Sequence, residues 1–437
     1  MENYNKISEL ILKIKNKKIT IGIVGLGYVG LPLALRFAEV GFNVIGYDKD
    51  IIKTEKLKKF KSYIKSILDK DLNKKNFLPT SSLKQLSKSD VIIICLPTPL
   101  KKYSKTPDMS YIKNFALKLK NFLRQYHIII LESTTYPGTT SEFFLPIIKK
   151  KGFIPGKDIF LIYSPEREDP GNKKHSIKDI PKVVSGYSFN CRKIGTSIYG
   201  KVAKKTIEVK SLEHAEMVKL YENVYRSINI GLANEMKIVC DKMKLNIFEV
   251  IKAASTKPFG FSPFYPGPGY GGHCIPIDPF YLSWKSKKFG YTPKFIELSG
   301  KINNSMPSYV KDNIKKVLKK NKKKTYKILI LGIAYKKNVD DLRESPAIQL
   351  LNILQKEKNL KIDFYDPYIK EINSRNKKFK GVKYFDLKYK KLNKYDLVVI
   401  VTDHDNLNYE QILNNSKAII DCRGRFYNIE DTKIIQS

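Results

Sequence analysis

The feature that most constrains the fold is a glycine triplet near the N-terminus. Residues 25–30 read GLGYVG, directly after a short apolar run at 19–24 and directly before a helical stretch at 31–40. A second apolar run at 43–47 ends at Asp48. This order of strand, glycine turn, helix, strand and acidic residue is typical of a dinucleotide-binding βαβ unit in a doubly wound parallel sheet.

Each glycine of the triplet has a separate physical task. Gly25 permits the tight turn, Gly27 lets backbone N–H groups approach a pyrophosphate, and Gly30 allows the helix to pack closely on the strand. Asp48 can bind the adenosine ribose hydroxyls and would repel a 2′-phosphate, so NAD is predicted rather than NADP; Lys53 weakens this preference a little. The predicted cofactor contacts in this part of the chain are Gly25, Gly27, Tyr28, Val29, Gly30, Asp48, Lys53 and Thr98.

Further apolar runs alternate with lysine-rich helical segments. Buried strands are predicted at 91–96, 128–131 and 159–163. The pattern returns near residue 326, with strands at 327–333, 361–365, 397–402 and 418–421. The second copy again has an acidic residue, Asp366, after a strand, but it lacks the full glycine triplet. We therefore expect a second Rossmann-like sheet with a different ligand.

A long helical segment separates the two repeats, because residues 211–241 have apolar side chains at helical spacing and no strand break. The predicted fold is α/β, with two Rossmann-like doubly wound domains joined by a long central helix. The predicted divisions are a cofactor domain at 1–208, a central helical or dimerisation region at 209–310 and a second Rossmann-like domain at 311–437.

The composition limits the class of partner. Lys and Arg number 81 against 42 Asp and Glu, a net charge of +39 that could attract nucleic acid. Only nine of the 81 are arginine, which supplies most base-edge contacts, so we interpret the excess as compositional bias and expect no nucleic-acid partner. The N-terminus lacks a signal sequence and no run reaches about 18 apolar residues, so we expect a cytoplasmic protein without membrane insertion. Five scattered histidines and five cysteines without a C-x-x-C pair predict no metal site.

The most unusual stretch is a loop of glycine and proline around one cysteine. Residues 267–279 read GPGYGGHCIPIDP. Glycine allows close approach to a ligand and proline restricts the loop, so Cys274 could be held at a cleft, where its thiolate could attack a carbonyl carbon. Asp278 could orient a water or a proton. A buried structural thiol is the alternative interpretation for Cys274, and it is our interpretation of the other four cysteines.

A dehydrogenase has a specific use for such a cysteine. Oxidation of a primary alcohol gives an aldehyde, and thiolate addition gives a thiohemiacetal. A second oxidation gives a thioester, from which water releases the carboxylate. The covalent link would keep the aldehyde from escaping, and two NAD molecules would be consumed for each substrate.

Six ordered blocks of this chain resemble the UDP-glucose/GDP-mannose dehydrogenase family, at residues 22–34, 132–140, 163–168, 213–226, 267–278 and 331–347. The resemblance implies two Rossmann-like domains joined by a long helix. It also implies that the N-terminal domain binds NAD, that the C-terminal domain binds the nucleoside diphosphate of a UDP-sugar, and that the chain forms a homodimer or a higher homo-oligomer.

The same resemblance implies roles for individual residues. Cys274 matches the nucleophile. Lys219 and Asn223, one helical turn apart, match a pair that stabilises the oxyanion. Glu166 and Asp278 match residues that position and activate the hydrolytic water. Other implied roles are a water-binding hydroxyl beside the cofactor for Thr135 and contact with the cofactor pyrophosphate for Arg343. The implied substrate contacts are Glu166, Arg167, Lys219, Asn223, Tyr270, Gly271, Tyr335, Lys336 and Arg423.

The chain departs from the family pattern at two places that affect which sugar it is expected to oxidise. Residues 164–168 read SPERE where UDP-glucose members commonly read NPEFL, and Pro258 stands near the place of a basic residue that some members use. The string SPEREDPGN at 164–172 is more similar to members that oxidise UDP-N-acetyl-D-glucosamine or its galacto epimer, with Arg167 near the N-acetyl group or a phosphate. We predict four-electron oxidation of C6 of UDP-N-acetyl-D-glucosamine, with UDP-glucose or UDP-GalNAc as alternatives.

Two other functions stay open. An NAD-retaining nucleotide-sugar epimerase or reductase would use a Y-x-x-x-K motif, which residues 281–285 and 384–388 both spell. Chance matches are expected in a lysine-rich chain, and we expect neither to lie in a mid-domain helix. A cationic module that binds nucleic acid or acidic membrane is the second alternative.

Overall fold

The computed structural model describes residues 2–64, 67–101, 104, 106–168, 176–319, 323–372, 379 and 381–437. The chain divides into two compact units. The first is Met1–Glu222 with Trp284–Gly290, and the second is Asn223–Ser283 with Tyr291–Ser437. Helices α8 (Leu212–Met243) and α10 (Asp278–Lys287) contribute residues to both units.

The first unit is built on an eight-stranded sheet in the order β3-β2-β1-β4-β5-β6-β7-β8. All neighbours are parallel except β6 and β7. The direction of chain progression reverses between β1 and β4, which is where doubly wound sheets bind nucleotides. The strands are β1 (Thr20–Val24), β2 (Asn43–Tyr47), β3 (Phe77–Thr80), β4 (Val91–Ile94), β5 (Ile128–Leu131), β6 (Phe160–Tyr163), β7 (Lys182–Gly186) and β8 (Thr206–Glu208).

Strand alternation divides the apolar side chains of this sheet between two cores. Ile128 and Ile130 of β5 belong to one core, and Ile129 and Leu131 belong to the other. The first core is covered by α1 (Glu2–Lys15), α2 (Gly30–Glu39), α3 (Ile51–Lys58) and α7 (Phe189–Tyr199). The second is covered by α4 (Leu83–Leu86), α5 (Ser110–Leu119) and α6 (Thr139–Lys150). Because both faces are buried, the strands are apolar along their whole length.

The second unit has a smaller, wholly parallel sheet in the order β11-β10-β9-β12-β13-β14. Its strands are β9 (Tyr326–Leu331), β10 (Leu360–Tyr365), β11 (Lys383–Tyr384), β12 (Leu397–Ile400), β13 (Ile419–Asp421) and β14 (Ile434–Gln436). Its other helices are α9 (Ile247–Ala254), α11 (Lys294–Lys319), α12 (Pro346–Leu354) and α13 (Tyr409–Asn415). Two short 3-10 helices, Asp69–Leu72 in the first unit and Tyr389–Lys394 in the second, complete the fold.

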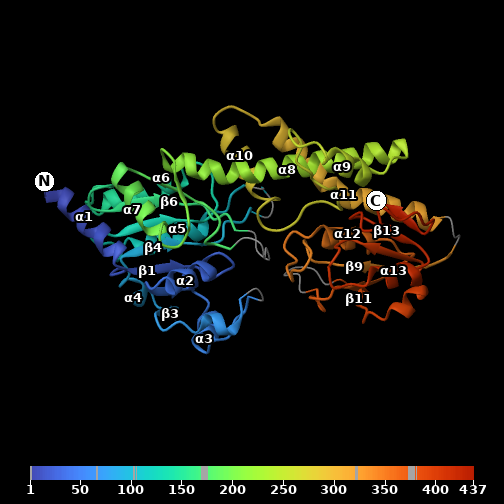
Figure 1. Cartoon of the computed structure of the whole chain (residues 1–437), viewed down its shortest axis with the longest axis horizontal. Coiled ribbons are helices and arrows are strands. Elements are labelled where there is room, and N and C mark those ends of the chain that lie inside the picture. The colour runs from blue at the N-terminus through green and yellow to red at the C-terminus, as the bar shows by residue number, and fades with distance from the viewer. Residues whose placement is uncertain are drawn as a thin grey trace. The chain divides into compact units, whose positions relative to one another are not determined.

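The predicted fold class is confirmed, since both sheets are Rossmann-like and α8 is one unbroken helix of 32 residues (Figure 1). Each expected strand is present with a shift of no more than two residues at either end. The expectations omitted β3, β7, β8, β11 and β14. The predicted three-part division of the chain stays a prediction. In the described part of the chain, no helix has the length and apolar character needed to cross a membrane.

Candidate active site

In the turn after β1, two of the three glycines are packed against backbone atoms and the third faces open space. Gly25 has a φ of 94°, and a Cβ on it would lie 2.7 Å from the carbonyl oxygen of Cys95. A Cβ on Gly30 would lie 1.9 Å from the carbonyl oxygen of Gly25. By contrast, nothing lies within 4 Å of a Cβ placed on Gly27, so the turn is open where a pyrophosphate would approach. Two further predicted residues of this loop are half-buried: Tyr28 and Val29.

Asp48 is fixed beside this turn. One carboxylate oxygen accepts the N–H of Leu26 at 3.0 Å and the other accepts the N–H of Asp50 at 3.0 Å. Each oxygen has a second lone pair, so ribose hydroxyls can still be bound. Lys53 Nζ lies 3.7 Å from Asp48 Oδ2, which reduces but does not remove the negative charge that a 2′-phosphate would meet.

Two threonines follow the carboxyl ends of the neighbouring strands β4 and β5. Thr98 Oγ1 donates to the carbonyl of Thr134 at 2.8 Å. Thr135 is fully buried, and among the residues that the structure describes nothing hydrogen-bonds to its Oγ1. A buried hydroxyl without a protein partner is expected to bind a water or a ligand. Together with the open turn at Gly27, this fits a dinucleotide bound along the edge of the sheet.

Glu166 lies three residues after the end of β6 and is held through both carboxylate oxygens. Oε1 accepts the backbone N–H groups of Arg167 and Glu168 at 2.6 Å each, and Oε2 lies 3.4 Å from Lys182 Nζ. Burial acts to raise the pKa of Glu166, but the charges of Lys182 and Lys219 and the two N–H donors keep it below its usual value. Glu166 is therefore a carboxylate that stays ionised, as an activator of water requires.

The guanidinium group of Arg167 donates hydrogen bonds to acceptors within the protein. Its Nε and Nη2 lie 2.8 and 2.6 Å from Glu222 Oε1, and its Nη1 donates to the carbonyl of Pro181 at 2.8 Å. Two of its five N–H groups are left for a ligand. The rest of the string that suggested the sugar, residues 169–172, lies outside the described residues.

Helix α8 presents Lys219 and Asn223 one turn apart, and both are buried. Asn223 lies in the second unit, where its Nδ2 donates to Asp278 Oδ2 at 2.5 Å. Asp278 is itself buried at the start of α10. The amide therefore fixes one oxygen of Asp278.

The cysteine loop forms a tight turn that leads into α10. The carbonyl of Cys274 accepts the N–H groups of Ile277 and Asp278 at 3.0 and 2.8 Å, so the thiol lies about one helical turn before Asp278. Cys274 is half-buried, whereas Cys191, Cys240 and Cys422 are buried. A cysteine held in a fixed turn and not fully buried suits a nucleophile. Cys95, the remaining cysteine, is half-buried and packs against the first core.

Glycine is required in this loop because of its close packing within the second unit. A Cβ on Gly271 would lie 2.6 Å from Tyr335 Cβ, and one on Gly272, whose φ is 86°, would lie 2.9 Å from the Tyr335 ring. A Cβ on Gly267 would lie 2.6 Å from Arg423 Nη1, and Arg423 Nε donates to the carbonyl of Val401 at 2.9 Å. The second unit thus brings the loop together with two of the predicted substrate contacts.

The other predicted residues of this unit lie along the same segments. Tyr270 is buried, and burial raises its pKa to about 12. Lys336 is half-buried next to Tyr335. Arg343 is exposed and pairs with Asp341, its Nη2 lying 2.5 Å from Asp341 Oδ2, while its carbonyl accepts the N–H of Gly272 at 2.9 Å. Its predicted contact with the cofactor stays a prediction.

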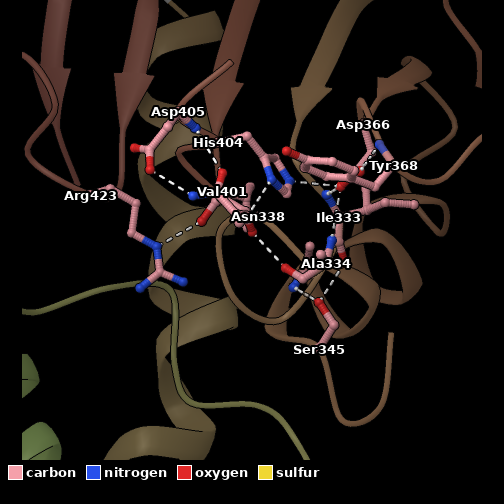
Figure 2. Close-up of polar contacts among 12 residues, drawn as sticks. Ile333, Ala334, Asn338, Ser345, Asp366, Tyr368, Val401, His404, Asp405 and Arg423 are labelled. Atoms are coloured by element: carbon pink, nitrogen blue, oxygen red, sulfur yellow. Dashed lines mark hydrogen bonds and ion pairs between the residues drawn. The ribbon is translucent and has the colours of Figure 1, made fainter. Parts of the chain in front are cut away.

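The second sheet repeats the acidic residue after its second strand but uses it differently (Figure 2). Asp366 Oδ2 accepts the N–H groups of Ile333 and Ala334 at 2.8 and 3.1 Å and lies 3.0 Å from His404 Nε2. His404 Nδ1 accepts the N–H of Asn338 at 3.0 Å, so Nε2 carries the proton. Both members of the pair are fully buried. Asp366 is occupied within the protein, which supports the expected difference in ligand between the two sheets.

Several residues of mechanistic interest had no sequence signal. Glu132 and Lys182 form a buried ion pair behind Glu166, and His404 pairs with Asp366. Of the two Y-x-x-x-K matches, residues 281–285 lie in α10, a helix that contributes residues to both units. In that match Tyr281 is fully buried and Lys285 Nζ lies 2.5 Å from Glu142 Oε1. Within the described ranges, no group of three His, Cys, Asp or Glu could hold a metal ion.

The chain matches three family models in order. They describe the NAD binding domain, the central domain and the UDP binding domain of the UDP-glucose/GDP-mannose dehydrogenase family, at residues 19–203, 213–305 and 329–428.

UDP-N-acetyl-D-glucosamine 6-dehydrogenase of Pseudomonas aeruginosa is 34% identical, with 81% of this chain and 84% of that protein covered. UDP-N-acetyl-D-mannosamine dehydrogenase of Methanocaldococcus jannaschii is also 34% identical, with 92% of each covered. The structure of the UDP-D-ManNAc dehydrogenase of Pyrococcus horikoshii superimposes with a TM-score of 0.83 at 30% identity, covering 95% of this chain and 97% of that one.

Proposed function

This chain belongs to the UDP-glucose/GDP-mannose dehydrogenase family, and from that premise we propose that it oxidises C6 of a UDP-N-acetylhexosamine, UDP-N-acetyl-D-glucosamine first, to the carboxylate. The chain is an NAD-dependent UDP-sugar dehydrogenase, with an NAD-binding domain and a UDP-binding domain. What we propose is the identity of the sugar and the roles of the individual residues. The observation that carries it is a half-buried Cys274 in a fixed turn next to the buried Asn223–Asp278 pair.

The proposed reaction balances as alcohol, two NAD⁺ and water giving carboxylate, two NADH and three protons. NAD, held at the turn of residues 25–30, would accept a hydride in each oxidation. The Cys274 thiolate forms a C–S bond to the aldehyde carbon and leaves as the thiol when water cleaves the thioester. Lys219 and Asn223 donate to the oxyanion, which is the arrangement that stabilises a tetrahedral centre. Glu166 and Asp278 remove the proton of the attacking water.

An acetamido group at C2 of the sugar is supported by two relatives that are equally similar in sequence. One is named for the gluco sugar and the other for the manno sugar, and both names carry an N-acetyl group. In this chain, Arg167 keeps two N–H groups for an acetamido oxygen or a phosphate after its three protein contacts. The configuration at C2 is therefore the finer question, with the gluco sugar as our first choice and the manno sugar as the second.

The test is NADH release from UDP-GlcNAc, UDP-ManNAc, UDP-GalNAc, UDP-glucose and GDP-mannose under identical conditions. We expect two NADH per molecule of UDP-GlcNAc consumed and a uronate product detected by mass. A preference for UDP-ManNAc at the same stoichiometry would move the assignment to the second choice. Conversion of the sugar without net NADH would contradict the oxidation and favour an epimerase.

We further propose that the enzyme works in the cytoplasm as a homodimer or a higher homo-oligomer. Its product would be a uronic acid donor for a surface polysaccharide or glycan. Light scattering of the purified chain tests the assembly, and a monomeric active enzyme would contradict it.

A further inference from the structure

A buried charged group lies behind Glu166 in the first unit. Glu132 follows β5, Lys182 is the first residue of β7, and Tyr199 is the last residue of α7. Glu132 and Tyr199 are completely buried, and Lys182 is 7% exposed. Ionisable side chains are seldom buried this deeply unless they are paired, so their contacts matter.

The contacts place one ammonium group between two carboxylates. Lys182 Nζ lies 2.9 Å from Glu132 Oε2 and 3.4 Å from Glu166 Oε2. The Tyr199 hydroxyl donates to the other oxygen of Glu132, and Lys182 Nζ lies 5.2 Å from the centre of the Tyr199 ring. Each carboxylate thus competes for a single cation inside the unit.

We propose that Lys182 is a positioning residue that keeps Glu166 ionised and oriented for thioester hydrolysis, while Glu132, itself fixed by Tyr199, holds the Lys182 ammonium in place. This inference rests on the proposed function, in which Glu166 activates the hydrolytic water. A buried ion pair is seldom the most stable choice, because an apolar pair of similar size serves a core equally well or better. The Glu132–Lys182 pair contacts Glu166 through the Lys182 ammonium, and this contact points to a role in the reaction.

Several ionisable side chains surround Glu166. On its own loop are Arg167 and Glu168, and on other elements are Lys182, Glu132, Cys95 and Lys219. Burial raises the pKa of Glu132 to about 7, and burial together with Glu166 raises that of Glu168 to about 8. Burial would lower the pKa of Lys182, but the two carboxylates raise it, so this cation stays charged at every pH at which the enzyme works.

Two single substitutions should affect the acid limb of hydrolysis differently. Lys182→Met removes the cation, so the pKa of Glu166 rises and hydrolysis is lost at a higher pH as the solution is acidified. Glu132→Gln removes a carboxyl group whose pKa is about 7, so it carries no charge at the pH where Glu166 titrates, and the acid limb should stay in place. A loss of fold would slow both variants without moving the acid limb of Lys182→Met alone.

The experiment follows the Cys274 acyl adduct in the full chain by rapid quench and mass spectrometry, from about pH 3.5 to pH 8, with UDP-GlcNAc and NAD, because the ordinary carboxyl pKa is about 4. For Lys182→Met we expect the acid limb of adduct hydrolysis to rise by about one pH unit, which is tenfold slower hydrolysis on that limb. The initial burst of NADH should remain. Lys182→Arg should restore most of the rate, and Lys205→Met, an exposed lysine of the same unit, serves as the matched control.

The double variant Glu132→Gln with Lys182→Met guards against a failure to fold, because neither position of the Glu132–Lys182 pair then carries a charge. Its profile should resemble that of Lys182→Met alone. An unmoved acid limb in Lys182→Met, or an equal upward shift in Glu132→Gln, would overturn the role of Lys182 while the wild-type adduct still forms. If the wild type forms no adduct on Cys274 with any UDP-sugar, the proposed function fails first, and the inference fails with it.

Discussion

At the scale of single residues, the proposed chemistry depends on where the Cys274 sulfur is held. Its carbonyl closes a turn onto Ile277 and Asp278, and the glycines before it pack against Tyr335. The backbone is thus fixed on both sides of the thiol. A residue held this way keeps its reactive atom in place without relying on side-chain contacts, and this suits a nucleophile that must reach a carbon at a defined angle.

Cys274→Ala should abolish formation of the uronate, because no thioester can form. The measurement is the yield of product and NADH with UDP-GlcNAc, together with the mass of the protein after a quench. Cys240→Ala is a matched control, since Cys240 is buried in a small apolar cluster of the second unit, and it should keep its turnover. Full uronate formation by Cys274→Ala would rule out the covalent route.

Lys219→Ala should reduce kcat by about a hundredfold or more with little change in KM, because an oxyanion donor acts mainly in the transition state. Steady-state kinetics with UDP-GlcNAc measures the two constants separately. The exposed Lys242 of the same helix offers the control, Lys242→Ala, for which no change is expected. An increase in KM alone would identify Lys219 as a substrate-binding residue and not as an oxyanion donor.

At the scale of elements, the comparison of the two sheets explains what the sequence could predict. The strands at 43–47 and 128–131 occur as expected, since apolar, mostly β-branched runs buried on both faces leave a clear pattern. The omitted strands are short or lie near the sheet edges, and β3 contains Pro79, so their patterns are weak. The glycine turn and the cysteine loop were predicted because motifs reveal local backbone geometry.

Pairings distant in sequence could not be predicted. Lys182 and Glu132 are 50 residues apart, and Lys182 is one of many lysines in the chain. His404 and Asp366 are 38 residues apart, at the ends of different strands. Periodicity identifies strands but does not indicate which polar side chains meet after them. Such pairs depend on strand order, which only the assembled sheet provides.

Asp366→Asn should destabilise the second unit by about 1–3 kcal/mol at pH 7, because a buried acceptor of three backbone N–H groups and His404 is weakened. Burial acts to raise the pKa of Asp366, but these partners lower it overall. A depressed carboxyl pKa stabilises the fold above the unfolded pKa, and this contribution is lost as the pH falls through the folded value.

The difference in stability between wild type and Asp366→Asn should therefore shrink below about pH 4, near the ordinary pKa of aspartate. Urea unfolding followed by tyrosine fluorescence at pH 7 and at pH 3.5 measures it. Asp405→Asn, at an exposed site that also contacts Asn338, provides the control and should change stability little. A difference that stays constant with pH would mean that Asp366 is not ionised in the folded unit.

At the scale of the whole molecule, the charge of +39 acts on all ligands at once. NAD and UDP-sugars are anionic, so a cationic surface should raise their rate of encounter without altering the chemical steps. Specific recognition of nucleic acid would need arginines at base edges, and only nine of the 81 basic residues are arginine. The charge is thus expected to affect kcat/KM and not kcat.

Raising the NaCl concentration from about 50 to 300 mM should lower kcat/KM for the UDP-sugar a few-fold and leave kcat nearly unchanged, since salt screens long-range attraction between exposed charges. Steady-state rates at fixed pH and saturating NAD measure this, with sucrose at matched osmolarity as the control for solvent effects. Double-stranded DNA added at 150 mM salt should not inhibit. A kcat/KM that is independent of salt would show that the excess of lysine is compositional bias alone, whereas strong inhibition by DNA would indicate that the cationic surface also binds nucleic acid.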